Sequence, residues 1–193
     1  MRVSGTAGEG PFLMSVEDVF SLRQGRTVML TGRIERGRVH RGDEVEIVGP
    51  GGGATVRVAD IDASRARVAE AGTDTHVGIL LPGTAAQRAE RGHVLATPGS
   101  ISAHARFTAD ITLLPEEQGG ADVVSGDRLH FYTRSAAVWA TVELHGIDVV
   151  RPLHGAEVTV TLDEPVALEQ NQPFAFRHHG RAAGSGTVLG LPR

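Results

Sequence analysis

The sequence of 193 residues contains no cysteine and no lysine. Without cysteine the chain forms no disulfide and offers no thiolate to a substrate or a metal, which is typical of a cytoplasmic protein. Without lysine it lacks the residue that a P-loop uses to hold phosphate and that Schiff-base enzymes use as a nucleophile. P-loop nucleotide hydrolysis is therefore excluded for this sequence, and we expect neither GTP nor Mg²⁺ as a cofactor.

Long apolar runs are also missing. No stretch approaches the roughly 18 apolar residues of a membrane helix, and the start MRVSGTAGEG lacks the apolar segment of a secretory signal. No G-x-G-x-x-G motif follows a predicted strand, so a dinucleotide-binding fold has no support. The formal net charge is −4, and any contact with nucleic acid must therefore be local rather than spread over a basic surface.

Short apolar or alternating segments between glycine-containing turns predict strands along most of the chain. The predicted strands cover residues 27–31, 45–48, 56–61 and 77–81 in the first half, and 107–114, 129–133, 138–144, 158–162, 174–176 and 186–189 in the second. One short helix is predicted at 84–91. This spacing is typical of all-β barrels or sandwiches, and Pro98, Gly99 and Ser100 mark a domain boundary.

Several motifs follow one another in a specific order. They are PFLMSVEDVF, GRTVMLTGRIERGRVHRGDEVEIVG, HVGILLPG, ERGHVLATPGSISAHARF, HFYTRS, LDEPVALEQNQPFAFR and HGRAAGSGTV. Together they resemble the second and third domains of bacterial elongation factor Tu over residues 11–190. The resemblance implies two consecutive β-barrels without the GTPase domain, in either a truncated paralogue or an excised fragment. We expect a flexible tail at 1–10, a first barrel at 11–99 and a second at 100–193.

In the family the first barrel holds the 3′ end of aminoacyl-tRNA. Carried over by position, the resemblance implies a pocket for that end formed by Glu17, Asp18, Phe20, Leu22, Met29, Thr31, Asp62, Arg65, His76 and Leu80. Asp62 matches a glutamate beside the terminal ribose, and Arg65 matches an arginine near the terminal nucleotide. His76 stands where the family has an asparagine near the aminoacyl group.

The second barrel departs further from the family pattern. Arg134, Arg177 and Arg181 remain as candidates for contact with the tRNA stem, whereas His130 and the pair His178-His179 replace family residues. Because adjacent residues on a strand diverge and no third ligand is spaced with the histidine pair, we predict no metal site there. We interpret Tyr132 and Trp139, which takes the place of a small residue, as packing residues of the core or between domains.

Three residues of PFLMSVEDVF have competing interpretations. Paired carboxylates can perform acid–base catalysis, but the neighbours Glu17 and Asp18 should point to opposite faces of a strand, so we expect a pocket rim or a solvated turn instead. Phe20 is interpreted as barrel packing more readily than as a stacking surface, because aromatic residues are usually buried.

The sequence thus favours a non-catalytic, cytoplasmic binding module for the 3′ end of aminoacyl-tRNA. One alternative is a protein-interaction or regulatory paralogue that docks on the translation machinery or on a GTPase domain in trans. Another is a presenter of charged tRNA to an aminoacyl-transfer enzyme. No membrane association is expected.

Overall fold

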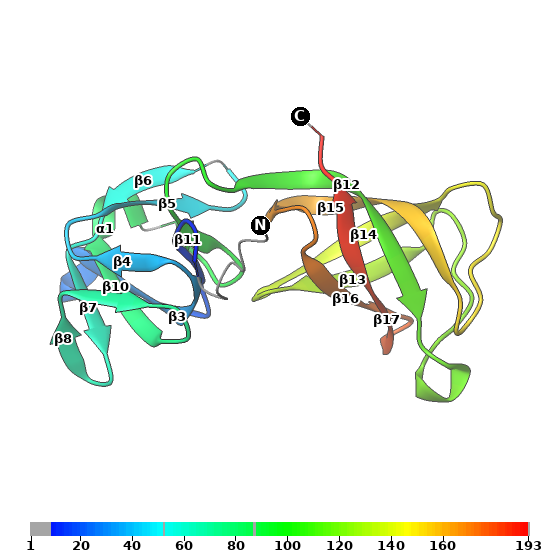
Figure 1. Cartoon of the computed structure of the whole chain (residues 1–193), viewed down its shortest axis with the longest axis horizontal. Coiled ribbons are helices and arrows are strands. Elements are labelled where there is room, and N and C mark those ends of the chain that lie inside the picture. Colours follow the sequence, from blue (N-terminus) through cyan, green and yellow to red (C-terminus); the bar gives the residue numbers. More distant parts are fainter. Residues whose placement is uncertain (1–8, 52, 87, 193) are drawn as a thin grey trace, which may run out of the picture. The chain divides into compact units, whose positions relative to one another are not determined.

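The structure is a computed structural model that describes residues 9–51, 53–86 and 88–192. The chain divides into two compact units at Ile101 and Ser102, and each contains its own strands (Figure 1). The first eight residues of the expected tail at 1–10 lie outside the described residues. Within the described ranges, no helix is both long and apolar enough to cross a membrane.

The first unit consists of short strands and one helical turn. Its elements are β1 (Leu13–Ser15), β2 (Asp18–Leu22), β3 (Thr27–Arg36), β4 (Arg38–His40), β5 (Glu44–Val48), β6 (Ala54–Arg57), β7 (Asp60–Ala63), β8 (Ala66–Val68), β9 (Glu70–Gly72), β10 (His76–Pro82), α1 (Gly83–Ala86) and β11 (Val94–Ala96). The main sheet has the order β6-β5-β11-β1-β3-β10-β7-β8, with β2 paired to β3. This sheet curls around its core, but its end strands β6 and β8 do not pair with each other among the described residues.

Alternation along β3 shows why the sheet curls around a core. Val28, Leu30 and Ile34 are buried in the core and Gly32 is buried in phase with them, while the residues that alternate with these four face outward. Position 32 requires glycine because the backbones of β1 and β3 approach each other closely there. A Cβ built on Gly32 would lie 1.8 Å from the backbone oxygen of Ser15. A side chain at this position would push β1 away from β3.

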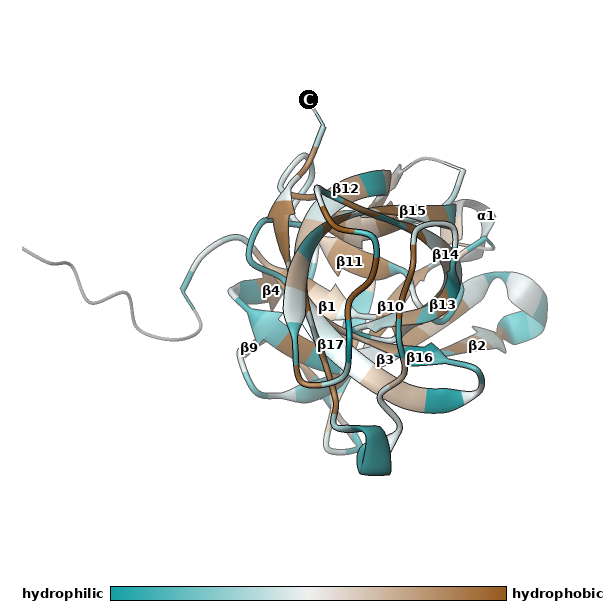
Figure 2. Cartoon of the chain, turned by 90° about the vertical axis from the view of Figure 1, so that its right-hand side faces the viewer, coloured by the Kyte–Doolittle hydropathy of each residue, from teal (hydrophilic) through white to brown (hydrophobic). Residues whose placement is uncertain are grey.

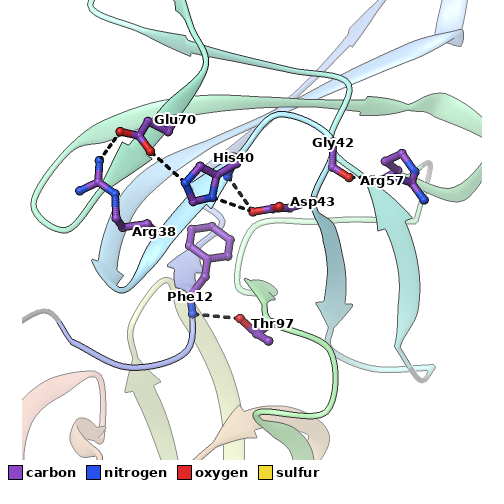
Figure 3. A network of polar contacts seen from close by, with 8 residues as sticks. All are labelled: Phe12, Arg38, His40, Gly42, Asp43, Arg57, Glu70 and Thr97. Carbon is purple, nitrogen blue, oxygen red and sulfur yellow. Dashed lines mark hydrogen bonds and ion pairs between the residues drawn. The ribbon is translucent and has the colours of Figure 1, made fainter.

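Strands β4 and β9 form a separate two-stranded ribbon in the first unit. Figure 3 shows Glu70 of β9 beside Arg38 and His40 of β4, with the ring of Phe12 below His40. Arg38 Nη2 lies 3.1 Å and His40 Nε2 lies 2.9 Å from the Glu70 carboxylate. Asp43 lies on the other side of the imidazole, 3.3 Å from Nδ1. These contacts are solvent-exposed and contribute little each, so the buried Phe12 and Val39 provide the main packing here.

The second unit is a closed barrel. Its strands are β12 (Ser102–Leu113), β13 (Arg128–Thr133), β14 (Ala136–Leu144), β15 (Gly155–Leu168), β16 (Pro173–His178) and β17 (Arg181–Gly190). They pair in the circular order β12-β15-β14-β13-β16-β17. Buried and more exposed residues alternate along β13 and β16, as expected when one face lines the interior, and Figure 2 colours the strands by the hydropathy of each residue.

Aromatic packing fills the barrel of the second unit. The Phe107 ring centroid lies 5.6 Å from that of Phe131 and 6.0 Å from that of Phe174. Phe174 pairs across the strands with Gly186, where a Cβ would lie 2.5 Å from the phenylalanine ring. The glycine therefore leaves the space that the ring occupies.

The predicted all-β class with two barrel-like units is confirmed. Two local predictions differ. Residues 56–61 are not one strand, because the backbone amide of Val58 bonds to Asp43 and that of Ala59 bonds to Leu80, which separates β6 from β7. The predicted helix at 84–91 is shorter and ends at Ala86 in the structure, with residue 87 outside the described ranges.

Candidate functional site

The outward side chains of β2, β3, β10 and β7 form one continuous surface, which we call the candidate face. Strand pairing aligns Asp18 with Thr31, Thr31 with Gly78, and Gly78 with Asp62. These four residues therefore form a row across four strands. Because side chains alternate along a strand, they lie opposite the core-facing Leu30, Ile79 and Ile61.

A second row on the same face lies beside the first. Here Phe20 aligns with Met29, Met29 with Leu80, and Leu80 with Asp60. Register also places Leu22 and His76 on this face, two residues beyond members of the rows. Eight of the ten residues predicted for the pocket are thus on one surface: Asp18, Phe20, Leu22, Met29, Thr31, Asp62, His76 and Leu80.

The centre of the candidate face is apolar and closely packed. Leu80 is 7% exposed, and a Cβ built on Gly78 would meet the Met29 sulfur at 2.7 Å. Met29 therefore lies over Gly78, with Leu80 beside it. A flat apolar ligand can rest on such a floor without a further change in the backbone.

The exposure of Phe20 differs from the expectation that this residue packs in the barrel. The residue is 45% exposed, so the interpretation of Phe20 as a core residue is wrong. Among the described residues, strand β2 pairs only with β3, and its other residues are exposed except for the half-buried Leu22. The strand therefore presents both of its faces to solvent, and Phe20 is available to a ligand.

Asp62 has a carboxylate oxygen that lacks a hydrogen bond within the described part of the chain. Its Oδ1 is buried and has no hydrogen-bond partner among the described residues. A buried acceptor without a donor destabilises a fold, by about 1–3 kcal/mol. The neighbouring Asp60 differs, because its Oδ1 accepts a hydrogen bond of 3.0 Å from the Ile61 amide. Because Oδ1 itself is buried, Asp62 can accept a hydrogen bond from a hydroxyl or ammonium group of a ligand after a rotation of its side chain.

Glu17 and His76 form one rim of the face. The His76 Nε2 lies 3.0 Å from Glu17 Oε2, and the Glu17 amide donates a 2.8 Å hydrogen bond to the Thr31 carbonyl. Arg91 donates a 3.4 Å hydrogen bond to the Glu17 carbonyl oxygen. Glu17 precedes β2, whereas Asp18 is its first residue, and the two carboxylates have different neighbours.

Arg65 lies at the tip of the β7–β8 hairpin, three residues beyond Asp62. Its φ is +65°, next to Ser64 with φ +51°, so a tight turn projects this exposed arginine. No carboxylate pairs with it in the parts of the chain that the structure describes. A guanidinium in this setting remains available to a phosphate.

The three arginines predicted to contact a tRNA stem differ in the structure. Arg134 has a side chain only 9% exposed, and it contacts Glu169 at 2.9 Å and Gln172 at 2.7 Å. It therefore holds the second barrel together, and the prediction that it contacts RNA is not supported. Arg177 and Arg181 are exposed on β16 and β17.

His178 and His179 do not diverge as the sequence suggested. Strand β16 ends at His178, and His179 has φ +54°, so strand alternation stops between them and the rings stack at 3.9 Å. His178 is 4% exposed, and burial lowers its pKa; the charge of His179 lowers it further, while Asp127 opposes the shift.

Trp139 was interpreted as a packing residue, but it is 50% exposed, so its assignment to the core is wrong. Its indole stacks on His130 at 4.6 Å, and Tyr132 lies on the other strand of the same pair. This group of rings cannot be predicted from the sequence, because it depends on the register between β13 and β14. Alternation in HFYTRS indicates only that His130 and Tyr132 share a face.

Comparison with known protein families gave two matches that follow one another along the chain. The family described as elongation factor Tu domain 2 matches residues 27–96. The family described as elongation factor Tu C-terminal domain matches residues 100–191. The first match includes β3, β7 and β10 of the candidate face and begins after β2.

Proposed function

The chain belongs to the elongation factor Tu family through its domain 2 and C-terminal domain, and from this premise we propose that it binds the 3′ end of aminoacyl-tRNA on the candidate face. The observation that carries the proposal is the unpartnered, buried oxygen of Asp62 beside an apolar floor. A terminal nucleoside offers the complementary groups, an apolar base and ribose hydroxyl donors.

Each part of the terminal nucleotide has a matching part of the face. The base rests on Met29 and Leu80, with the exposed Phe20 beside it. A ribose hydroxyl donates to Asp62, and Arg65 holds a phosphate. RNA ends are commonly recognised in this way, by stacking or apolar contact with the base combined with a few polar contacts to the sugar.

The aminoacyl group is proposed to lie toward Glu17 and His76. The contact between these side chains holds a carboxylate at the rim, where it can accept hydrogen bonds from the α-ammonium group. The proposal includes no GTP hydrolysis, because the sequence has no lysine for a P-loop. The chain acts here as a non-catalytic binding module of the translation-factor type.

The proposal is tested with charged and uncharged tRNA. We expect the protein to slow hydrolysis of the aminoacyl ester and to shift charged tRNA in a native gel more strongly than uncharged tRNA. Asp62→Ala should weaken this binding about tenfold, the effect of losing a hydrogen bond to a charged group. Glu44→Ala is the matched control, because Glu44 is an exposed carboxylate on β5, which does not pair with the strands of the candidate face.

A second pair of variants tests the phosphate contact. Arg65→Ala should weaken binding and make it less dependent on salt, because one phosphate contact is lost. Arg57→Ala removes an exposed arginine from β6 and should have little effect. Equal binding of charged and uncharged tRNA, or full retention of binding in Asp62→Ala and Arg65→Ala, would contradict the proposal.

A further inference from the structure

The second domain carries a group of aromatic rings, half-buried at His130 and Tyr132 and exposed at Trp139, that the proposed function does not use. Strand register aligns Arg177 of β16 with His130 of β13, and His130 with Trp139 of β14. Tyr132 lies two residues along β13, on the same face. We call His130, Tyr132 and Trp139 the aromatic patch.

Contacts between the rings hold the aromatic patch in one arrangement. The His130 and Trp139 rings are nearly parallel, with an interplanar angle of 9° and centroids 4.6 Å apart. The Tyr132 hydroxyl lies 2.8 Å from His130 Nδ1. Large rings that are already ordered lose little conformational entropy when a partner binds, which favours affinity. In addition, Tyr132 pairs with Ala137 on one side and Ala175 on the other, and these short side chains leave space for a partner beside the tyrosine ring.

The charges around the aromatic patch are unbalanced. Arg128 is neutralised by Asp163, with Nη1 of the arginine 2.8 Å from Oδ1, and this hydrogen bonding lowers the pKa of Asp163. Arg177 has no carboxylate partner among the described residues, and its guanidinium lies 5.9 Å from the Tyr132 centroid. Arg181, at the start of β17, is likewise exposed and without an ion pair in those ranges. The patch therefore has free positive charge at one edge, although the whole chain is negative.

Trp139 is half exposed, and two side chains of β13 contact its indole. His130 stacks on the indole, and the Arg128 guanidinium lies over the ring at 6.0 Å from its centroid. The stem of a folded RNA keeps its bases paired and is recognised through phosphates and 2′-hydroxyls, so it offers no base to an exposed indole. Tryptophan, tyrosine and arginine are the residues that dominate binding energy at protein–protein interfaces, where they fill pockets of the partner.

From these observations we propose that the aromatic patch docks a segment of a partner protein that covers the exposed part of Trp139 with apolar side chains and places a carboxylate against Arg177. The charge complementarity defines the partner as an acidic segment with apolar residues beside its Asp or Glu. This interaction is independent of the candidate face, because it uses residues of the second domain alone.

The experiment uses the full chain with a photo-reactive phenylalanine analogue at Ala137, an exposed residue beside the patch. After irradiation in cells, the cross-linked peptide is identified by mass spectrometry. We expect a protein segment that combines acidic and apolar residues. Trp139→Ala and Arg177→Glu should each reduce the cross-link about tenfold or more, as for central interface residues. Leu153→Ala and Arg151→Glu, exposed positions of the same domain outside the patch, are the matched controls.

A second measurement uses a synthetic peptide with the cross-linked sequence. Trp139 is the only tryptophan of the chain, so its fluorescence reports on the patch alone. Binding of the peptide should shift this emission in the wild type and not in Arg177→Glu, whose fold is checked by circular dichroism. A cross-link that is lost on ribonuclease treatment, a cross-link to a second copy of this chain, or a cross-link unaffected by both patch variants would overturn the proposal.

Discussion

The imidazole of His76 contacts the carboxylate of Glu17 at 3.0 Å, although 59 positions separate the two residues in the chain. The contact joins the start of β10 to the segment that precedes β2. Since both side chains remain substantially exposed, we infer that the contact shapes the rim of the candidate face more than it stabilises the fold.

This contact predicts that substitutions of Glu17 or His76 affect tRNA binding more than they affect the stability of the fold. Glu17→Ala and His76→Ala should each lower the free energy of unfolding by less than about 1 kcal/mol, as is usual for exposed pairs. Both should weaken the preference for charged over uncharged tRNA. Urea unfolding and gel shifts with the two single variants and the double variant measure the two effects. If His76→Ala retained the full preference for charged tRNA, His76 would have no part in the site.

Two glycines on paired strands should respond differently to the same substitution. A Cβ at Gly32 would collide with the Ser15 backbone, so Gly32→Ala should destabilise the first domain by about 3 kcal/mol or more. A Cβ at Gly78 would meet the end of the flexible Met29 side chain, which can move, so Gly78→Ala should cost about 1 kcal/mol.

Chemical denaturation of both glycine variants, followed by far-ultraviolet circular dichroism, gives the comparison. Gly78→Ala should also weaken tRNA binding, because Met29 must leave its position in the floor of the candidate face. Equal destabilisation by the two substitutions would show that the close approach of β1 to β3 is not the constraint on Gly32.

Arg134 should behave as a structural residue. Its removal breaks the partly buried ion pair with Glu169, and Arg134→Ala should lower stability by about 3 kcal/mol. Arg177→Ala is the matched control and should change stability by less than about 0.5 kcal/mol, since the residue is exposed. Thermal unfolding of the two variants distinguishes these effects, and a stable Arg134→Ala protein would refute the structural role.

His178 predicts how the stability of the second domain depends on pH. Burial lowers its pKa in the folded protein, while the unfolded chain keeps the ordinary value of 6.5. As the pH falls below 6.5, His178 therefore binds a proton more readily in the unfolded state than in the folded state. Stability is fully present above 6.5 and is lost as the pH falls through this value toward the lower folded pKa.

The pH prediction is measured by urea unfolding between about pH 7.5 and 5.5, the range in which histidine titrates. His178→Leu should make the loss of stability on acidification shallower, because the group that gains a proton on unfolding is gone. His154→Leu, at an exposed position of the same domain, serves as the control. An unchanged slope in His178→Leu would mean that His178 does not contribute to the acid sensitivity.

Much of this protein follows from local sequence. Alternation such as that of residues 44–48 predicted strands, and the ordered motifs indicated the family, which the matches to both domains support. The absence of lysine excluded a P-loop without any structure. These conclusions depend on neighbouring residues or on residue types alone, so no long-range contact was needed to reach them.

Tertiary structure decided which of the notable side chains meet solvent. Phe20 and Trp139 are exposed and the side chain of Arg134 is largely covered, each contrary to what its residue type suggested. Exposure depends on which segment packs against a residue, and that segment can be distant in sequence. Among the described residues β2 pairs only with β3, which leaves Phe20 exposed. Trp139 lies opposite His130 of the neighbouring strand, and Glu169 contacts Arg134 from 35 positions away. Residue type sets the free energy of burying a side chain, but only strand register and barrel closure determine whether other atoms cover it.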